Sequence, residues 1–375
     1  MPILKIFLDI LGFIFALGII VFIHELGHFS VAKFFGLYVN EFSLGFGPIL
    51  LSHKSKETRY SLRAIPLGGF VSVVGEEDDK LTPNEDEYID PTLYEGRTVQ
   101  DLSTIKKCIF TLAGVFMNFL LALAIMTGIL LSQKQVIGEA GTTIESVVEG
   151  YPASKAGLME GDTLIKLESV GLKTNLKSYD DLLYYMELYQ GDGDISVTFK
   201  RDGETYTKVI SPIKEDDSYM LGVSFAAADV VDVTLLNCIP LAFTKLYSVF
   251  KATLNALRGL FFGVGLNNLG GPIRIYEETS NAISMGFEYY ILIIMSLSLN
   301  IGIMNLLPVP ALDGGRTLIY IAEGIIGKKC PKKLENILMT LSLFILVALM
   351  AFVMIKDTAG LLFKWQDLNI IYLCS

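Results

Sequence analysis

The sequence predicts a polytopic α-helical membrane protein with four transmembrane helices, a membrane-associated β-hairpin region and an inserted α+β domain. Three observations support this fold class. The 375 residues are 52% hydrophobic with a mean hydropathy of +0.50, which is too apolar for an ordinary soluble protein of this size. Four apolar stretches each approach the roughly 20 residues that a helix needs to cross hydrocarbon. Between the second and the third stretch, a long hydrophilic region has the strand and turn pattern of a folded domain.

The predicted elements follow one another along the chain. The four predicted spans are residues 7–23, 109–131, 290–307 and 337–355. The predicted regions are the first helix within 1–35, a cytoplasmic or re-entrant β-region with an acidic loop at 36–107, the second helix at 108–132, an extracytoplasmic domain at 133–222, an amphipathic or re-entrant helical segment at 223–288, the third helix and the turn after it at 289–315, and a cytoplasmic connection, the fourth helix and a C-terminal tail at 316–375.

The first apolar stretch has a competing interpretation as a cleaved signal peptide, because Lys5 precedes it as a positively charged n-region would. A small-residue cleavage site does not follow it. Instead His24 and Glu25 come next, so we interpret the stretch as a transmembrane helix.

Lysines beside the spans predict the orientation. Lys106 and Lys107 precede the second span, and four more lysines lie before the fourth, at positions 328, 329, 332 and 333. Cytoplasmic flanks carry an excess of Lys and Arg, so these ends are expected in the cytoplasm. Both termini and residues 133–288 are then expected outside.

Charge and cysteine usage exclude some functions. The net charge is −10, and a phosphate-binding basic face is not visible, which argues against a nucleic-acid partner. The cysteines at 108, 238, 330 and 374 form no C-x-x-C pair and fall in different predicted environments. They therefore indicate neither a cysteine metal site nor a disulfide framework.

Residues 37–75 alternate apolar residues with glycines, which is typical of β-hairpins and here places them close to the membrane. Residues 76–101 are acidic and rich in turn-forming residues. A solvated loop and a packed structure are both compatible with that composition.

Residues 135–215 closely resemble a bacterial PDZ domain in the order of their strand, turn and helix signals. The resemblance implies a peptide groove that adds an extended peptide to a sheet edge, bordered by a helix at 182–189. Backbone amides near 137–141 are expected to hold a terminal carboxylate. A purely structural β-domain is the alternative. Residues 233–285 are amphipathic and glycine-containing, which favours helices that lie on the membrane surface or partly enter it.

His24, Glu25 and His28 form the sequence His-Glu-Leu-Gly-His at the end of the first apolar stretch. Positions i and i+4 of a helix share one face, so both imidazoles could ligate one zinc ion. Zinc lowers the pKa of a bound water from about 15.7 to about 7, and Glu25 is the expected general base that takes its proton. A chance motif or an inactive relic is the alternative, although three ionisable residues at the end of a span are costly without a metal or partners.

A catalytic zinc ion has three protein ligands and one open position, so a third ligand must come from elsewhere. Asp313 follows the third span, at the same predicted depth as His24 and His28. Taken alone, Asp313-Gly314-Gly315 is an ordinary turn signal. The prolines before it stop the helix and open irregular backbone, which survives at membrane depth only around a cavity or the protein interior.

The sequences H-E-L-G-H at 24–28 and L-P-V-P-A-L-D-G-G at 307–315, with the PDZ-like region between the second and third spans, resemble the bacterial site-2 protease family over nearly the whole chain. The resemblance implies a zinc metalloendopeptidase with one Zn²⁺ per chain, ligated by His24, His28 and Asp313. The chain is most similar to family members with a single PDZ domain. Those members lie in the bacterial cell membrane, where they release sigma factors by cutting single-span anti-sigma factors, or clear remnant signal peptides.

The same resemblance implies a substrate-binding set. Asn305 is expected to hold the substrate backbone, and Asn118 to line the cleft, although Asn118 is equally compatible with helix-helix packing. The hairpin at Gly45, Phe46 and Gly47 is expected to receive the substrate as an added strand. Larger family members carry two tandem PDZ domains, whereas this chain has room for one.

Two other function classes remain open at this point. One is a catalytically inactive membrane adaptor that binds peptides through the PDZ-like domain. The other is a transporter, since helices broken by Gly and Pro also form midplane sites, but an inverted repeat is not visible in the sequence.

Overall fold

The structure, a computed structural model, describes residues 2–74, 92, 94–138, 140–189, 191, 193–215, 218–226, 229–261 and 270–373. The chain forms two compact units, each of which is described by itself. Unit 1 comprises Met1–Met126 and Leu269–Ser375, and unit 2 comprises Thr127–Asn268. Most of the predicted acidic loop at 76–101 lies outside the described residues.

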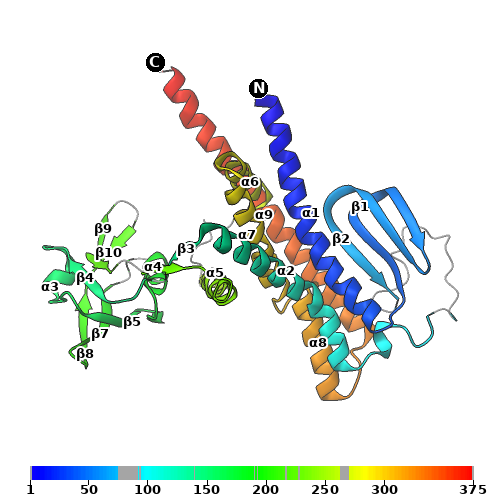
Figure 1. Cartoon of the computed structure of the whole chain (residues 1–375), viewed down its shortest axis with the longest axis horizontal. Coiled ribbons are helices and arrows are strands. Elements are labelled where there is room, and N and C mark those ends of the chain that lie inside the picture. Colours follow the sequence, from blue (N-terminus) through cyan, green and yellow to red (C-terminus); the bar gives the residue numbers. More distant parts are fainter. Residues whose placement is uncertain are drawn as a thin grey trace. The chain divides into compact units, whose positions relative to one another are not determined.

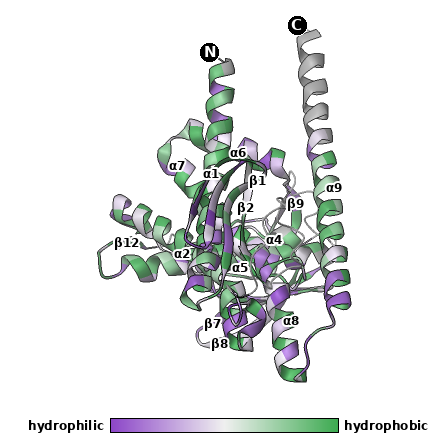
Figure 2. Ribbon diagram, turned by 90° about the vertical axis from the view of Figure 1, so that its right-hand side faces the viewer, coloured by the Kyte–Doolittle hydropathy of each residue, from purple (hydrophilic) through white to green (hydrophobic). Residues whose placement is uncertain are grey.

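Within the described residues, four helices are long and apolar enough to cross a membrane, which confirms the four predicted spans. They belong to α1 (Pro2–Phe34), α2 (Thr104–Gln133), α7 (Phe287–Asn305) and α9 (Lys332–Leu373). Figure 2 shows apolar residues running along the ribbons of α1, α7 and α9. The helix α9 continues without a break from the fourth span through the predicted C-terminal tail to Leu373.

Unit 1 is assembled around α1 (Figure 1). Ala16 and Ile20 of α1 are buried against Ile294 of α7, and Tyr290 donates a 2.7 Å hydrogen bond to the carbonyl of Gly12. The helix α6 (Pro272–Met285) also packs on α1, where Ser280 donates a 2.7 Å hydrogen bond to Asp9 and the ring centroids of Tyr276 and Phe13 are 5.9 Å apart.

The strands β1 (Val39–Ser55) and β2 (Thr58–Val73) form an antiparallel sheet beside α1. Both strands bend and pair with each other twice. Residues 41–44 pair on one side with 59–62 and on the other side with 69–72. The strand segment 69–72 therefore lies at an edge of the sheet, because among the described residues only 41–44 pair with it.

A buried ion pair crosslinks this sheet. Arg63 donates to Glu41 at 2.7 Å, to the hydroxyl of Ser43 at 3.0 Å and to the carbonyl of Gly47 at 2.9 Å. Glu41 is 3% exposed and Arg63 4%. Buried charges persist when each finds such partners, so the pair fixes where β1 bends at Gly47.

Unit 2 contains a four-stranded antiparallel sheet in the order β6-β5-β7-β8, with smaller strand pairs beside it. Its strands are β3 (Gln135–Ile137), β4 (Ile144–Val147), β5 (Thr163–Ser169), β6 (Leu172–Asn175), β7 (Ile195–Arg201), β8 (Glu204–Ile210), β9 (Ile213–Glu215), β10 (Ser218–Met220), β11 (Val223–Phe225) and β12 (Val230–Asp232). Its remaining helices are α3 (Pro152–Lys155), α4 (Tyr179–Leu188) and α5 (Cys238–Phe261). Leu164, Leu167, Val197 and Phe199 of the sheet share a core with Tyr185 of α4.

Two sequence-based boundaries were wrong. The predicted domain at 133–222 stops too early, because β11 pairs with β4 and β12 pairs with β3. The segment 223–288 is not one element, since α5 belongs to unit 2 and α6 to unit 1. Short return strands carry little periodicity, so strand pairing between distant segments could not be deduced from them.

In the predicted carboxylate-binding segment 137–141, the first two residues make backbone contacts within unit 2. Ile137 pairs with Val230, and the amide of Gly138 donates to the carbonyl of Asp229 at 2.8 Å. These backbone groups are engaged within the chain. The strand β11 has one edge paired with β4 and lies near α4, where Phe225 contacts Tyr179 at a ring distance of 5.3 Å.

Arg201 and Asp162 form a bidentate ion pair inside unit 2, with N···O distances of 2.7 and 2.8 Å. Burial of Asp162 opposes its charge, but Arg201 and the amide of Met159 hold the pKa of Asp162 below its usual value. We expect Arg201→Met to destabilise unit 2 by about 1–3 kcal/mol, because the carboxylate stays buried with fewer partners. Hydrogen exchange of β5 and β7 in the full-length chain measures this loss.

The contribution of the Asp162–Arg201 ion pair to folding stability should depend on pH in one direction. A depressed carboxyl pKa stabilises the fold above the unfolded value of about 3.9, and this contribution disappears as the pH falls through the folded pKa. The difference in the free energy of unfolding between the parent and Arg201→Met should therefore become smaller below about pH 4. The matched control is Lys200→Met at the exposed neighbouring position. Equal protection of the parent and Arg201→Met at pH 7 would contradict the stabilising role.

Candidate metal centre

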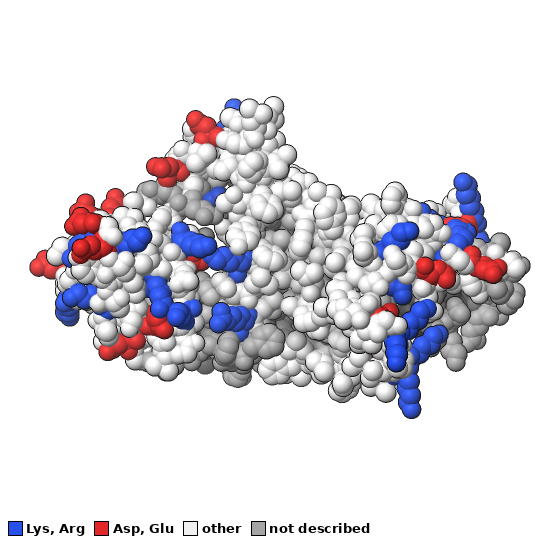
Figure 3. Space-filling model, turned by 90° about the horizontal axis from the view of Figure 1, so that it is seen from below, with Lys and Arg blue, Asp and Glu red and all other residues white. Residues whose placement is uncertain are grey.

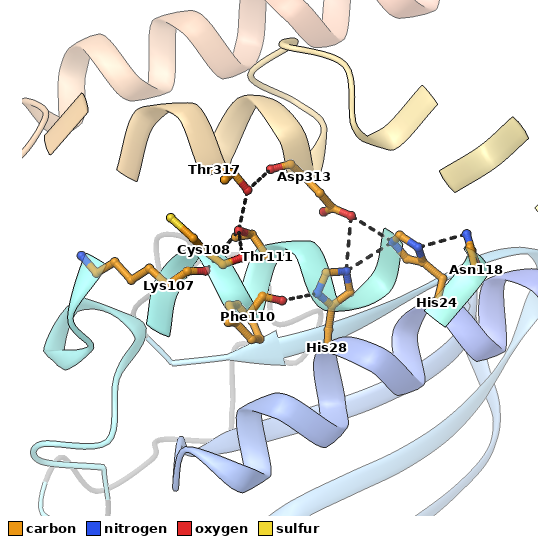
Figure 4. Close-up of polar contacts among 9 residues, drawn as sticks. All are labelled: His24, His28, Lys107, Cys108, Phe110, Thr111, Asn118, Asp313 and Thr317. Atoms are coloured by element: carbon orange, nitrogen blue, oxygen red, sulfur yellow. Dashed lines mark hydrogen bonds and ion pairs between the residues drawn. The ribbon is translucent and has the colours of Figure 1, made fainter. Parts of the chain in front are cut away.

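The side chains of His24 and His28 lie on one face of α1, one helical turn apart, as their spacing predicts. The Nε2 atoms of the two rings are 3.2 Å apart. The third group is Asp313, the first residue of α8 (Asp313–Ile326). Its Oδ2 atom is 3.3 Å from Nε2 of His24 and 3.5 Å from Nε2 of His28, so three ligand atoms converge on one point (Figure 4).

This triangle has the dimensions of a zinc site. Bonds of about 2.0–2.2 Å around a tetrahedral ion place its ligand atoms about 3.3–3.6 Å apart. The chain's three distances, 3.2, 3.3 and 3.5 Å, match that requirement closely. Oδ2 of Asp313 is buried, and these two nitrogens are its only partners among the described residues. Two imidazoles and one carboxylate could thus supply three ligands to one zinc ion, and a tetrahedral ion has one further position besides these.

Tight backbone packing places Asp313. A Cβ atom on Gly314 would lie 2.2 Å from the carbonyl oxygen of Leu306, and one on Gly315 would lie 2.1 Å from that of Val309. The loop after α7 can therefore fold onto the start of α8 only with glycines at these positions. The hydroxyls of Thr317 and Thr111 then join α8 to α2 at 2.7 Å (Figure 4).

A second close approach brings α2 to the histidines. A Cβ atom on Gly114 would lie 2.4 Å from Nε2 of His28 and 2.6 Å from Cε1 of His24. On α1, a Cβ atom on Gly27 would lie 2.4 Å from the carbonyl oxygen of Ala113. These two glycines give the space in which both helices and both rings fit.

Glu25 faces the edge of the β-sheet. Its carboxylate accepts a hydrogen bond from the backbone of Val71, and a Cβ atom on Gly69 would lie 3.1 Å from its Cγ atom. The free edge at 69–72 therefore runs directly beside the side chain that follows His24.

Comparison with known proteins decides the family. The model of peptidase family M50 matches residues 12–349, which is most of the chain. This chain belongs to peptidase family M50. Among the relatives are three proteins named as candidate zinc metalloproteases. That of Clostridium perfringens is 34% identical over 91% of this chain and 96% of its own length, that of Clostridium acetobutylicum 31% over 94% and 97%, and that of Rickettsia conorii 30% over 94% and 99%.

Membership of family M50, together with the four apolar helices, makes this chain a multi-pass membrane peptidase. It confirms the family that the sequence resembles. The ligand and catalytic roles of individual residues stay predictions, which the geometry above supports.

The predicted substrate-binding residues of this family M50 peptidase lie in different surroundings. Asn118 is fully buried and its carboxamide contacts His24, so it does not line an open cleft. Asn305 is the last residue of α7, before the loop that leads to Asp313.

Gly45, Phe46 and Gly47 lie near the bend of β1, and their role in receiving the substrate stays a prediction. A Cβ atom on Gly45 would lie 2.6 Å from the carbonyl oxygen of Ile65, Phe46 pairs with Ile65, and Gly47 accepts from Arg63. Among the described residues Phe46 pairs with Ile65 alone, so these contacts engage one side of the segment. The edge that lies beside Glu25 is the one formed by Gly69 and its neighbours.

The sequence analysis assigned no role beside the metal centre to Gly69 or Gly114. The missing side chain of Gly69 leaves room for Glu25, and that of Gly114 leaves room for the rings of His24 and His28. The signal was available in part, since a glycine within an apolar helix often marks a close approach.

Gly114 supports a sharp prediction. We expect Gly114→Ala to weaken metal binding by roughly 10- to 100-fold, since the added methyl group must displace both imidazoles and such misplacement acts like the loss of an orienting partner. Zinc affinity measured by chelator competition tests it.

The matched control for this prediction is Gly128→Ala on the same helix, where a Cβ atom would meet nothing within 4 Å. Unchanged zinc affinity in Gly114→Ala would show that the rings are not held as described.

Proposed function

We propose that this chain is a zinc-dependent intramembrane endopeptidase that cleaves single-span membrane proteins, with His24, His28 and Asp313 as metal ligands and Glu25 as general base. The observation that carries the proposal is the triangle of 3.2, 3.3 and 3.5 Å between ligand atoms at the end of a membrane-spanning helix. An intramembrane position is costly for such groups unless they bind a cation and do chemistry.

The chain's own residues define the reaction. Zinc, when bound, acidifies a water molecule and polarises the scissile carbonyl. Glu25 takes the proton from the attacking water and delivers it to the departing amide nitrogen, as a general base and then a general acid. The hydrogen bond from Val71 holds the Glu25 carboxylate in place for both transfers.

The edge at 69–72 supports a way to present the substrate. A transmembrane helix hides its carbonyls in internal hydrogen bonds, so it must unwind before hydrolysis. An extended segment that pairs with this edge replaces those hydrogen bonds, and it lies beside Glu25 because the edge does. Gly69 suits this role, since it has no side chain to separate the added strand from Glu25.

The substrate class and location are proposed as anti-sigma-factor-like proteins or remnant signal peptides in a bacterial cell membrane. Bacterial relatives and the sequence resemblance support this assignment. Exposed lysines at 328, 329, 332 and 333 favour a cytoplasmic end for the turn between α8 and α9, and Figure 3 shows basic side chains gathered at this end of unit 1. Unit 2, proposed as PDZ-like, is then extracytoplasmic, with β11 and α4 bordering its peptide groove.

The test uses the purified full-length chain in lipid vesicles with a tagged single-span substrate. We expect fragments whose new ends, located by mass spectrometry, lie within the apolar segment of the substrate. Cleavage should stop with a zinc chelator and return with added zinc. Cuts only in the hydrophilic flanks would contradict intramembrane cleavage. Stable substrate binding with neither cleavage nor zinc would favour the adaptor function.

A further inference from the structure

The helix α2 contributes none of the three proposed ligands, yet it contacts both histidines. The contacts come from Phe110, Gly114 and Asn118, which recur every fourth residue and therefore share one face of the helix. The carbonyl of Phe110 is 3.0 Å from Nδ1 of His28, and the carboxamide of Asn118 is 3.3 Å from Nδ1 of His24 (Figure 4). Gly114, between them, leaves the space for both rings.

The contacts decide which ring nitrogen is free to bind metal. A neutral imidazole carries its proton on one nitrogen, and the group that accepts this proton fixes the other nitrogen as the ligand. The carbonyl of Phe110 can only accept, so Nδ1 of His28 carries the proton and Nε2 is left for zinc. For Nε2 of His24 to bind as well, its Nδ1 also needs an acceptor.

Asn118 is the residue that supplies this acceptor. Its Oδ1 atom is buried without a hydrogen-bond partner, while Nδ2 is the atom that faces His24. Both orientations of a carboxamide fill the same volume. Metal on Nε2 of His24 selects the orientation in which Oδ1 accepts from Nδ1, because Nδ2 cannot accept a proton.

We infer that Asn118 is a positioning residue for the metal centre: its side-chain oxygen holds the tautomer and the ring orientation of His24. The inference rests on the proposed ligand set, and it replaces the predicted contact of Asn118 with substrate. The full burial of Asn118 agrees with it, since a substrate cannot reach the side chain without moving α2.

The main chain at Asn118 is held separately. Ser298 of α7 donates a 2.9 Å hydrogen bond to the backbone carbonyl of Asn118, so this link between α2 and α7 does not depend on the side chain. Substitutions of the Asn118 side chain therefore leave this hydrogen bond between α2 and α7 in place. Their effect on helix packing can then be distinguished from their effect on the metal centre.

The test compares zinc affinity, by chelator competition, in the full-length parent and two variants of similar size. We expect Asn118→Leu to weaken zinc binding by roughly 10- to 100-fold, the usual effect of removing an outer hydrogen-bond partner of a metal-bound imidazole. Asn118→Asp should bind zinc as tightly as the parent, because a carboxylate accepts the hydrogen bond from Nδ1 of His24 in either orientation. The visible spectrum of the Co²⁺-loaded parent should be retained in Asn118→Asp and altered in Asn118→Leu.

Two outcomes would overturn the inference. One is parent-like zinc affinity in Asn118→Leu, and the other is equal weakening in Asn118→Leu and Asn118→Asp, which indicates packing alone. His24→Ala separates these outcomes from failure of the ligand set. If His24→Ala binds zinc like the parent, the proposed ligands are wrong; if it loses zinc while Asn118→Leu does not, only the role of Asn118 is wrong.

Discussion

Glu25→Gln should abolish most cleavage while leaving zinc bound. Glutamine has the shape of glutamate and its carbonyl oxygen can still accept from Val71, so the ring geometry of His24 and His28 is preserved. It cannot take a proton from water, and general acid–base groups contribute about 10²- to 10⁴-fold to rate. We therefore expect the cleavage rate of a single-span substrate to fall by about that factor.

The measurement is the initial rate in vesicles, with zinc quantified in the same preparation. Glu278→Gln is the control, because this side chain is 59% exposed on α6 and lies on a different helix. Parent-like cleavage by Glu25→Gln would remove Glu25 as the base. Loss of zinc together with activity would assign it to metal binding instead.

Asp313→Ala should release the metal. It removes the only oxygen of the triangle and leaves two imidazoles, so zinc affinity should fall by more than the roughly 10- to 100-fold that follows loss of an outer-shell partner. Cleavage should disappear at zinc concentrations that saturate the parent. Equilibrium dialysis against a zinc buffer, followed by metal analysis, measures the affinity.

The matched control for Asp313→Ala is Glu145→Gln, which removes one exposed carboxylate in unit 2. Circular dichroism should show the same helix content in both variants. If Asp313→Ala keeps one tightly bound zinc per chain, a different residue completes the site, and Asp313, His24 and His28 form only a hydrogen-bonded cluster.

The sequence was sufficient for the parts of this molecule that local pattern determines. A fixed spacing of four residues brings His24 and His28 to one face of a helix, and long apolar runs define the spans. Asp313 could be placed near them because membrane topology itself restricts depth. The three residues then meet in the structure as a single triangle.

Contacts between distant segments were beyond these patterns. Gly114 and Gly69 matter for what they lack, and only the packed structure shows which side chains fill the space beside them. The double pairing of β1 and β2, which creates the edge at 69–72, could not be deduced from the sequence because a bend in one strand changes every later partner. Asn118 was expected to face substrate, and it faces His24 because its position on α2 is in register with Phe110 and Gly114.

The ion pair between Glu41 and Arg63 has a consequence for how the protein is made. During synthesis Glu41 emerges first, and its partner follows 22 residues later. Until the two meet, each charge would cost several kcal/mol in nonpolar surroundings, so neither strand is stable there alone. The strands β1 and β2 should therefore pair while both charges still have access to water, before the sheet packs against α1. Formation of this sheet is then expected to be an all-or-none step in biogenesis.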